Sequence, residues 1–465
     1  MTDLLIRNGR VLDPGSGLDL VGDVLIRDGR VAAVGPNLPG DGVEVVDATG
    51  LVVAPGFVDL HTHLRDPGFE YKETIATGTE AAARGGFTTV CCMPNTDPPI
   101  DTRATVEYVL RTAAASARVR VLPIGCVSRG REGHDLAELA DLAEAGCVAF
   151  SDDGAPVADG ALLRRALEYA RIHGLTIIDH CEDPEIAALG VMHEGWVSTR
   201  LGLRGQPAAA EQAYVARDIA VAAQAGGPVH IAHISTRGAV ELIRTAKERG
   251  LPVTAEVTPH HLTMTHHAVA FSDGSTPSAN GAGRDHPELV EGHHPELVEG
   301  LAYDTLAKVN PPLRSRDDVA ACVEALRDGV IAAIATDHAP HADYEKACEF
   351  DEAAFGVSGL ETAFGLCMTL VHSKALDLPT LIERLTSGPV RALGLDRFVS
   401  GLGTLAEGAP GDVVLLDPAA EWTVEPERFA SKGRNTPLAG RTLRGKVVAT
   451  VYGGEVVWSG EKVEA

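Results

Sequence analysis

Residues 54–63 read Ala54-Pro55-Gly56-Phe57-Val58-Asp59-Leu60-His61-Thr62-His63, an apolar run that ends in two histidines one residue apart. In a β-strand, residues i and i+2 project from the same face. A strand that ends at His61 and His63 therefore presents two imidazoles side by side, as a metal ion requires. The alternative is a chance pair among the 18 histidines of the chain, and the runs that follow argue against it.

Eight apolar runs of strand character alternate with helical stretches at a spacing of about 25–35 residues. This alternation predicts an α/β fold, a (β/α)8 TIM barrel, whose chemistry lies at the carboxyl ends of the strands. A doubly wound open sheet is the alternative. The predicted strands are Phe57–Leu64, Phe87–Met93, Val119–Val127, Cys147–Ser151, Thr176–Asp179, Val229–Ile234, Val253–Val257 and Val330–Ala335.

The two ends of the chain differ from this middle part. They contain short strand patterns separated by turn signals such as Asn8-Gly9. We therefore expect a flanking β-sandwich domain built from residues 1–54 plus 395–465, and a barrel over residues 55–394. Residues 272–300 are polar and contain the motif His-Pro-Glu-Leu-Val-Glu-Gly twice. They predict a disordered surface insertion, with a metal-binding or partner-binding tract as the alternative.

The composition narrows the class of protein. The formal charge of −25 argues against nucleic-acid partners and against anionic membrane surfaces. No apolar run approaches the roughly 18 residues that a membrane span needs, and the N-terminus lacks signal-peptide character. The eight cysteines show no CxxC spacing. We therefore expect a cytoplasmic protein with reduced thiols.

Polar residues follow five of the eight predicted strands. Imidazoles and carboxylates at neighbouring strand mouths predict a binuclear metal site that activates a water molecule. Arg65 lies two residues past His63 on the same strand face and can fork onto a substrate carboxylate. The strand ends carry His61, His63 and Arg65; Asp152 and Asp153; His180; His230 and His233; and Asp337, His338 and His341.

Two metal ions need an anion between them. Many binuclear hydrolases of this build use a carboxylated lysine on the fourth strand, but this chain has no lysine between Lys72 and Lys247. Asp152 or Asp153 must then take that role. The alternative for either aspartate is a capping or turn position before Gly154.

These residues lie in motifs that resemble the amidohydrolase superfamily, and most closely the dihydroorotases of the bacterial class I type. The resemblance runs through the whole barrel and both flanking β segments. The His-Leu-Arg-Asp-Pro-Gly and Val-Asn-Pro-Pro-Leu-Arg segments favour dihydroorotases over their relatives. The motifs are residues 55–68, Cys92-Met93-Pro94-Asn95-Thr96, Phe150-Ser151-Asp152-Asp153-Gly154, Asp179-His180-Cys181-Glu182, His233-Ile234-Ser235-Thr236, Val309-Asn310-Pro311-Pro312-Leu313-Arg314 and residues 335–341.

The resemblance implies a role for each site residue. The first zinc ion is held by His61, His63 and Asp337, the second by His180 and His233, and Asp153 bridges the two. Asp337 is also the general acid/base. The implied substrate-binding residues are His63, Arg65, Asn95, Asn310, His341 and the backbone of Phe355 and Gly356, which lie in a flexible loop.

The activity implied by the resemblance is the interconversion of (S)-dihydroorotate and N-carbamoyl-L-aspartate, the third step of de novo pyrimidine biosynthesis, with one or two zinc ions per chain. Aspartate transcarbamoylase and a second copy of the chain are the candidate partners. A hydantoinase, dihydropyrimidinase or allantoinase is the alternative within the fold. A non-catalytic barrel that scaffolds the transcarbamoylase is the alternative of another class, although every implied metal ligand is present.

Several nearby polar residues receive a different interpretation. We expect His230 to pack in the barrel or to hydrogen-bond to a metal ligand, and not to bind metal itself. We expect Asp152 to support Asp153 and not to bind metal. We assign His260 and His261 to packing or to the barrel rim. The chain departs from the family in Glu352-Ala353-Ala354, where relatives often have a proline before Phe-Gly. The insertion before Asn310 is a second departure.

Overall fold

The computed structural model describes residues 3–270 and 303–460. Its centre is a parallel sheet of eight strands in the order β15-β14-β13-β10-β9-β8-β7-β6. A parallel bridge between Thr62 and His338 joins the end of the first strand to the segment just past the last strand, so the sheet closes into a barrel. This confirms the predicted TIM barrel and shows that the open-sheet alternative is wrong. The strands are β6 Phe57–Thr62, β7 Phe87–Cys92, β8 Arg120–Gly125, β9 Ala149–Ser151, β10 Ile177–Asp179, β13 Val229–Ile231, β14 Val253–Val257 and β15 Ala333–Ile334.

Each predicted strand is present, but most are shorter than predicted. The eighth was expected over 330–335 and is hydrogen-bonded only at Ala333–Ile334. The apolar character of the sequence continues past the ladder because the flanking residues are also buried, in loops that line the ends of the barrel. Burial alone therefore does not mark where a strand ends.

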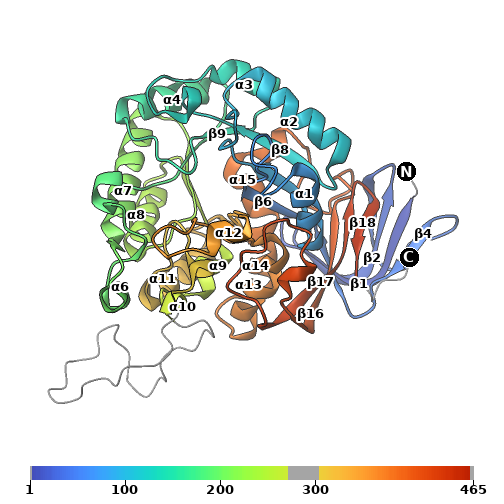
Figure 1. Cartoon of the computed structure of the whole chain (residues 1–465). Coiled ribbons are helices and arrows are strands. Elements are labelled where there is room, and N and C mark those ends of the chain that lie inside the picture. The colour runs from blue at the N-terminus through green and yellow to red at the C-terminus, as the bar shows by residue number, and fades with distance from the viewer. Residues whose placement is uncertain (1–2, 271–302, 461–465) are drawn as a thin grey trace, which may run out of the picture.

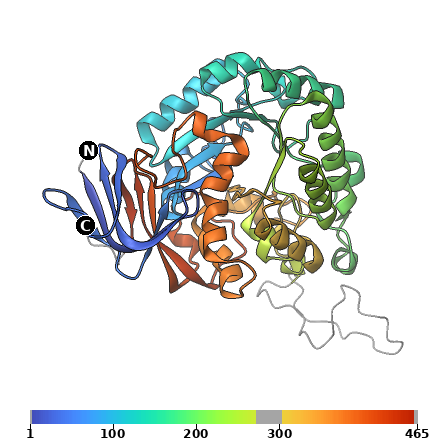
Figure 2. The same ribbon diagram turned by 180° about the vertical axis from the view of Figure 1, so that it is seen from behind.

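Helices surround the barrel on its outer side (Figure 1, Figure 2). Many begin at a side-chain cap in the sequence: Thr236 Oγ1 accepts the Ala239 N–H at the start of α8, and Asp159 caps α4. The long helices are α1 Ile75–Arg84, α2 Arg103–Ser116, α3 Leu139–Ala145, α4 Gly160–Ile172, α7 Ala208–Ala225, α8 Arg237–Glu248, α11 Arg316–Arg327, α13 Ala363–His372, α14 Leu378–Leu385 and α15 Ser387–Leu393. No helix in the two described ranges is long and apolar enough to cross a membrane.

A second eight-stranded sheet stands beside the barrel and contains both ends of the described chain (Figure 1). Strand β5 pairs with β1 from the N-terminal part and, antiparallel, with β16 from the C-terminal part. This confirms a flanking β domain built from both ends. Its strands are β1 Leu4–Asp13, β2 Leu18–Arg27, β3 Arg30–Gly35, β4 Glu44–Asp47, β5 Val52–Pro55, β16 Val413–Thr423, β17 Thr442–Tyr452 and β18 Glu455–Ser459.

Short elements follow the carboxyl ends of strands β10, β14 and β15, on the mouth side of the barrel. One of them, α12 Asp343–Lys346, leads into the loop that carries Phe355. The short elements are α5 Pro184–Ala187, β11 Met192–His193, α6 Trp196–Leu201, β12 Gly205–Gln206, α9 Pro259–Thr263, α10 His267–Ala270 and α12 Asp343–Lys346. The predicted insertion at 272–300 lies outside the described residues.

The interior of the barrel is mostly apolar at depth, apart from a buried polar chain of Thr254, His230 and Glu256, and it is polar at its mouth. Buried side chains such as Val58, Leu60, Cys91 and Ile124 form one cluster in the barrel. The polar residues gather beyond them, where the strands end. This arrangement places the predicted ligands from five strands around one point.

Candidate metal centre

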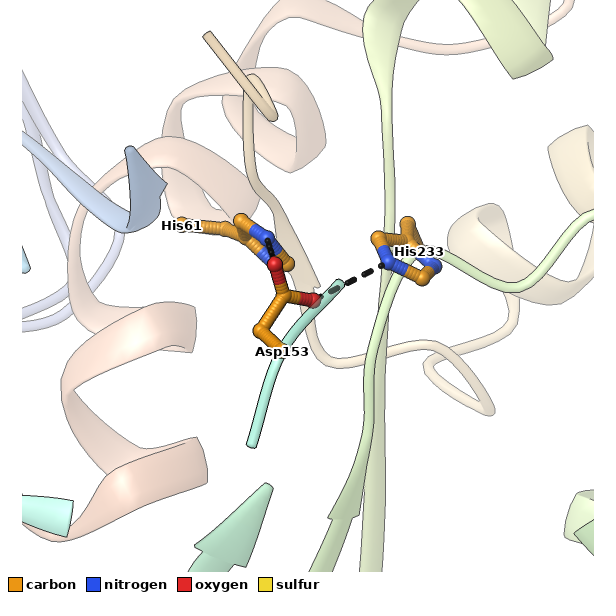
Figure 3. Close-up of side chains that lie close together, drawn as sticks. All are labelled: His61, Asp153 and His233. Atoms are coloured by element: carbon orange, nitrogen blue, oxygen red, sulfur yellow. Dashed lines mark ion pairs between the residues drawn. The ribbon is translucent and has the colours of Figure 1, made fainter. Parts of the chain in front are cut away.

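Asp153 lies at the centre of four imidazoles. Its Oδ2 lies 3.3 Å from His61 Nε2 and 3.5 Å from His63 Nε2. Its Oδ1 lies 3.6 Å from His233 Nε2 and 3.9 Å from His180 Nδ1. Figure 3 shows the carboxylate between His61 and His233. One oxygen therefore faces each pair of histidines, as a bridging carboxylate between two cations would.

Asp337 completes the side of the site formed by the first strand. Its Oδ1 lies 3.0 Å from His63 Nε2 and 3.6 Å from His61 Nε2. Its side chain, like those of the histidines, is almost fully buried. At this site, two groups of ligand atoms among the described residues are close enough to hold an ion: His61, His63 and Asp337, and His61, Asp153 and His233.

The unsatisfied atoms at this point fit a cation. His61 Nε2 and Asp153 Oδ1 are buried and have no hydrogen-bond partner among the described residues. Buried polar atoms normally have one. Burial alone would raise the pKa of Asp153, but His61 and His233 hold it well below its usual range. Zinc ions bind imidazole nitrogens and carboxylate oxygens, so this set of donors suits zinc. These residues fit a divalent metal ion.

Asp152 points away from this centre. Its Oδ1 accepts the backbone N–H groups of Val127 (2.9 Å) and Ser128 (3.1 Å), and its Oδ2 accepts the Ser128 hydroxyl (2.5 Å). All its strong contacts hold the neighbouring loop. Of the two aspartates that the sequence left open, only Asp153 faces the histidines.

Three residues of the site have left-handed backbone conformations. The φ angles are 62° at Arg65, 28° at His233 and 45° at Asp337. Such conformations are costly for residues other than glycine and occur often at functional sites. The expectation that Arg65 continues the strand face of His63 is wrong, because β6 ends at Thr62 and the chain turns before Arg65. The turn brings the guanidinium against the segment that follows the last strand of the barrel.

Arg65 and His341 lie together on one side of the mouth. Arg65 Nε donates to the Pro340 carbonyl (3.3 Å), and its Nη2 lies 3.5 Å from His341 Nε2. Burial lowers the pKa of His341 to about 3, and the neighbouring Arg65 and Lys72 act in the same direction. A neutral imidazole beside a fixed guanidinium leaves Arg65 as the charged group available to an anion.

The two asparagines expected to bind substrate contact metal-centre histidines instead of standing free. Asn95 Oδ1 accepts the Nδ1–H of His63 at 2.9 Å, which leaves His63 Nε2 to face the centre. Asn310 Nδ2 donates to His180 Nε2 at 3.1 Å. Phe355 and Gly356 lie in the loop after α12, where the Phe355 carbonyl accepts a bond from His341 Nε2 at 2.8 Å. The structure thus brings all the predicted site residues to one mouth.

Glu256 was not predicted and lies directly beneath His61. Its two oxygens accept the Nδ1–H of His61 at 2.9 Å and the Nε2–H of His230 at 3.1 Å. The first bond fixes the tautomer of His61 so that Nε2 is the free ligand atom. The signal in the sequence was a glutamate within the apolar strand Val253–Val257, where a charge must have a buried partner.

Glu73 is a second residue that sequence reasoning missed. It is fully buried and accepts bonds from His338 Nε2 (3.3 Å) and from the Ser431 hydroxyl (2.5 Å). His338 Nδ1 in turn accepts the Gly359 N–H at 3.2 Å. Both nitrogens of His338 are therefore engaged by protein groups, so His338 holds the chain next to Asp337.

A third group of possible ligands, Asp179, Cys181 and Asp218, has protein partners. Asp179 accepts the Val157 N–H at 2.9 Å and an Arg217 N–H at 3.2 Å. The Cys181 thiol donates to Asp218 at 3.2 Å. These contacts explain the group as a buried network behind His180, without an ion.

Comparisons with known proteins agree with this geometry. A family model described as Dihydro-orotase-like matches residues 50–239. The chain is 52% identical to the dihydroorotase of Anaeromyxobacter dehalogenans (strain 2CP-1), over 100% of both chains. It is 50% identical to the dihydroorotase of Pelotomaculum thermopropionicum, over 98% of both.

Similar solved structures extend the comparison of the fold. The L-hydantoinase (dihydropyrimidinase) of Arthrobacter aurescens superposes with a TM-score of 0.82 at 24% identity, over 100% of this chain and 98% of that one. The dihydropyrimidinase of Brevibacillus agri gives 0.79 at 23% identity, over 98% and 94%. At this identity the likeness concerns the fold alone. The full-length similarity at about half identity decides the family: this chain belongs to the dihydroorotases.

Proposed function

We propose that the chain interconverts (S)-dihydroorotate and N-carbamoyl-L-aspartate in pyrimidine biosynthesis. The observation that carries the proposal is the pairing of two features at one barrel mouth. One is a carboxylate with an oxygen facing each of two histidine pairs. The other is Arg65, held beside His341 at 3.5 Å, where the carboxylate of the substrate ring would bind.

We assign the metal as zinc and its ligands as His61, His63, Asp153, His180, His233 and Asp337. The donor set supports this choice, since imidazole and carboxylate ligands suit zinc. When bound, a pair of zinc ions supplies a water nucleophile near neutral pH and polarises the ring carbonyl. Asp153 would hold the two halves of the site together through its two oxygens.

Asp337 is the proposed general acid/base. It accepts a proton from the attacking water and returns it to the ring nitrogen as the amide C–N bond breaks. The carbonyl carbon becomes a carboxylate, and the nitrogen leaves as the NH2 of the carbamoyl group. The histidines around Asp337 hold its pKa far below the usual range even though burial acts in the opposite direction. Asp337 is therefore ionised and ready to accept a proton at the start of hydrolysis.

Arg65 is the proposed recognition residue for the ring carboxylate, together with Asn95, Asn310, His341 and the backbone of Phe355 and Gly356. A charged group that binds a carboxylate gives dihydroorotate an advantage over an uncharged cyclic imide. This separates the proposed activity from that of the hydantoinase fold relatives.

The test is a side-by-side assay of the purified chain with dihydroorotate and with hydantoin, together with metal analysis. We expect dihydroorotate turnover, little or no turnover of hydantoin, and one to two zinc ions per chain. Preference for hydantoin would point to a hydantoinase. Metal without turnover of either substrate would point to a scaffold protein.

We also propose the division of the chain into a β-sandwich domain of residues 1–54 plus 395–465 and a barrel of residues 55–394. The antiparallel pairing of β5 with β16 supports it. A cytoplasmic location agrees with eight unpaired cysteines, seven of them buried. Aspartate transcarbamoylase and a second copy of the chain are the partners to test, by co-purification and by size-exclusion chromatography.

A further inference from the structure

Two buried lysines lie behind the loop that carries Phe355 and Gly356. The exposed fraction is 2% for Lys308 and 4% for Lys346. Among the residues that the structure describes, neither ammonium group forms an ion pair with a carboxylate. Lysine is rarely buried without a charged partner. Backbone carbonyls take the place of a carboxylate around both ammonium groups.

Lys346 ends α12 and bonds to three carbonyls. Its Nζ donates to the carbonyls of Thr305 (3.0 Å), Lys308 (3.2 Å) and Ala354 (2.6 Å). An ammonium group has three N–H bonds, so each carbonyl takes one. The first two carbonyls belong to the segment just before Asn310, and the third belongs to the residue before Phe355. One side chain therefore joins the two segments.

Lys308 strengthens the same junction from the other side. Its Nζ donates to the carbonyls of Phe350 (2.7 Å) and Asp351 (3.1 Å) and lies 4.4 Å from the centroid of the Phe355 ring. Its own carbonyl accepts the Gly356 N–H at 2.9 Å. Contacts with Lys308 therefore hold the loop at Phe350 and Asp351 on one side and at Gly356 on the other.

The three carbonyl contacts of Lys346 favour its ammonium form against the effect of burial. Burial lowers the pKa of Lys346 to about 7, and Lys308 acts in the same direction, while Asp304, Cys348 and Glu345 oppose it. The three carbonyl dipoles directed at Nζ favour the ammonium form. A neutral amine has only two N–H bonds and would leave one of the carbonyls unbonded.

We propose that Lys346 is a positioning residue that ties the segment carrying Asn310 to the loop carrying Phe355 and Gly356, and so fixes two walls of the substrate pocket relative to each other. The proposal rests on the proposed function for the identity of the substrate. The contacts themselves do not depend on it. Lys346 touches none of the predicted metal ligands, so its effect reaches the substrate through the two segments that it joins.

Lys346→Met is the direct test, because methionine keeps most of the length and volume and removes all three donors. We expect the KM for dihydroorotate to rise on the order of tenfold to a hundredfold, since the pocket walls lose their relative position. We expect kcat to change by less than about threefold, and the zinc content to stay as in the wild type, since the metal centre is not touched. Lys346→Gln retains two N–H donors, so its KM should lie between those of the wild type and Lys346→Met.

Lys247→Met is the matched control. Lys247 Nζ also donates to two backbone carbonyls, those of Gly329 (2.7 Å) and Val330 (3.1 Å). These lie before β15, at the end of the barrel opposite the site. The control should cost some stability and leave KM unchanged, which separates a general loss of stability from a loss of loop position.

Hydrogen exchange measured by mass spectrometry gives a readout independent of activity. Peptides that cover residues 347–357 should exchange faster in Lys346→Met, and by less in Lys346→Gln, but not in Lys247→Met. Unchanged exchange in both Lys346 variants, or a loss in kcat with KM unchanged, would overturn the proposal. If the wild type failed to turn over dihydroorotate while exchange rose as expected, the proposed function would be wrong and the role of Lys346 in the loop would stand.

Discussion

Exchanging Asp153 for asparagine, and separately Asp152 for asparagine, applies the same chemical change at two adjacent residues with different surroundings. The carboxylate of Asp153 lies 3.3–3.9 Å from four imidazole nitrogens. Asparagine keeps its shape but removes the anion that two cations would share. We expect Asp153→Asn to lose at least one equivalent of metal and to lower kcat/KM by more than about a hundredfold.

Asp152 should behave differently because its contacts are structural. It accepts three hydrogen bonds, from Val127 N, Ser128 N and the Ser128 hydroxyl. Bonds to a charged group contribute about 1.5–3 kcal/mol and neutral ones about 0.5–1.5 kcal/mol, so asparagine weakens each by about 1 kcal/mol. The free energy of unfolding should fall by at most about 2–3 kcal/mol, because burying an amide is easier than burying a carboxylate. Metal content should be unchanged and activity should fall by about tenfold or less.

The measurements are metal content by elemental analysis, kcat/KM with dihydroorotate, and denaturant unfolding of the metal-free proteins. The two variants should differ: Asp153→Asn should lose metal, and Asp152→Asn should lose free energy of unfolding. If Asp152→Asn lost the metal and Asp153→Asn retained it, the assignment of the bridge would be wrong. If both lost metal equally, the pair would act as one unit and the contrast drawn from their contacts would fail.

Three further changes test other parts of the site and the fold. Arg65→Met should cost roughly 1.5–3 kcal/mol of transition-state binding free energy, read from the fall in kcat/KM for dihydroorotate, and should spare an uncharged cyclic imide. Equal losses on both substrates would indicate a structural role. Glu256→Gln should weaken metal affinity by about 10–100-fold in a chelator titration, since one amide cannot accept from both His61 and His230; unchanged affinity would exclude that support. Burial raises the pKa of Glu361 from 4.5 to about 7, so the folded state retains a proton that the unfolded state releases. The free energy of unfolding should fall as pH rises through this window, and Glu361→Gln should flatten that slope in denaturant titrations at pH 5 and pH 8; an equal slope in both proteins would contradict the assignment.

The sequence by itself determined the barrel and which residues meet at the candidate metal centre. Strand and helix periodicities are local properties, so eight alternations sufficed to predict a closed parallel sheet. The carboxyl ends of parallel strands meet at one mouth, so residues such as His61, Asp153 and Asp337 could be placed together without coordinates. The missing lysine on the fourth strand pointed to one of two aspartates, Asp152 or Asp153, as the predicted bridge.

The tertiary structure alone decided the contacts between segments far apart in the chain. Glu256 meets His61 across 195 residues, and Ser431 reaches Glu73 across 358. No local pattern records which buried charge meets which partner, because that depends on how the strands and loops close around the barrel. The turn at Arg65 and the bonds of Lys346 are of the same kind. Both are backbone and carbonyl geometries that arise only after the loops have packed, and they position the residues of the proposed substrate pocket.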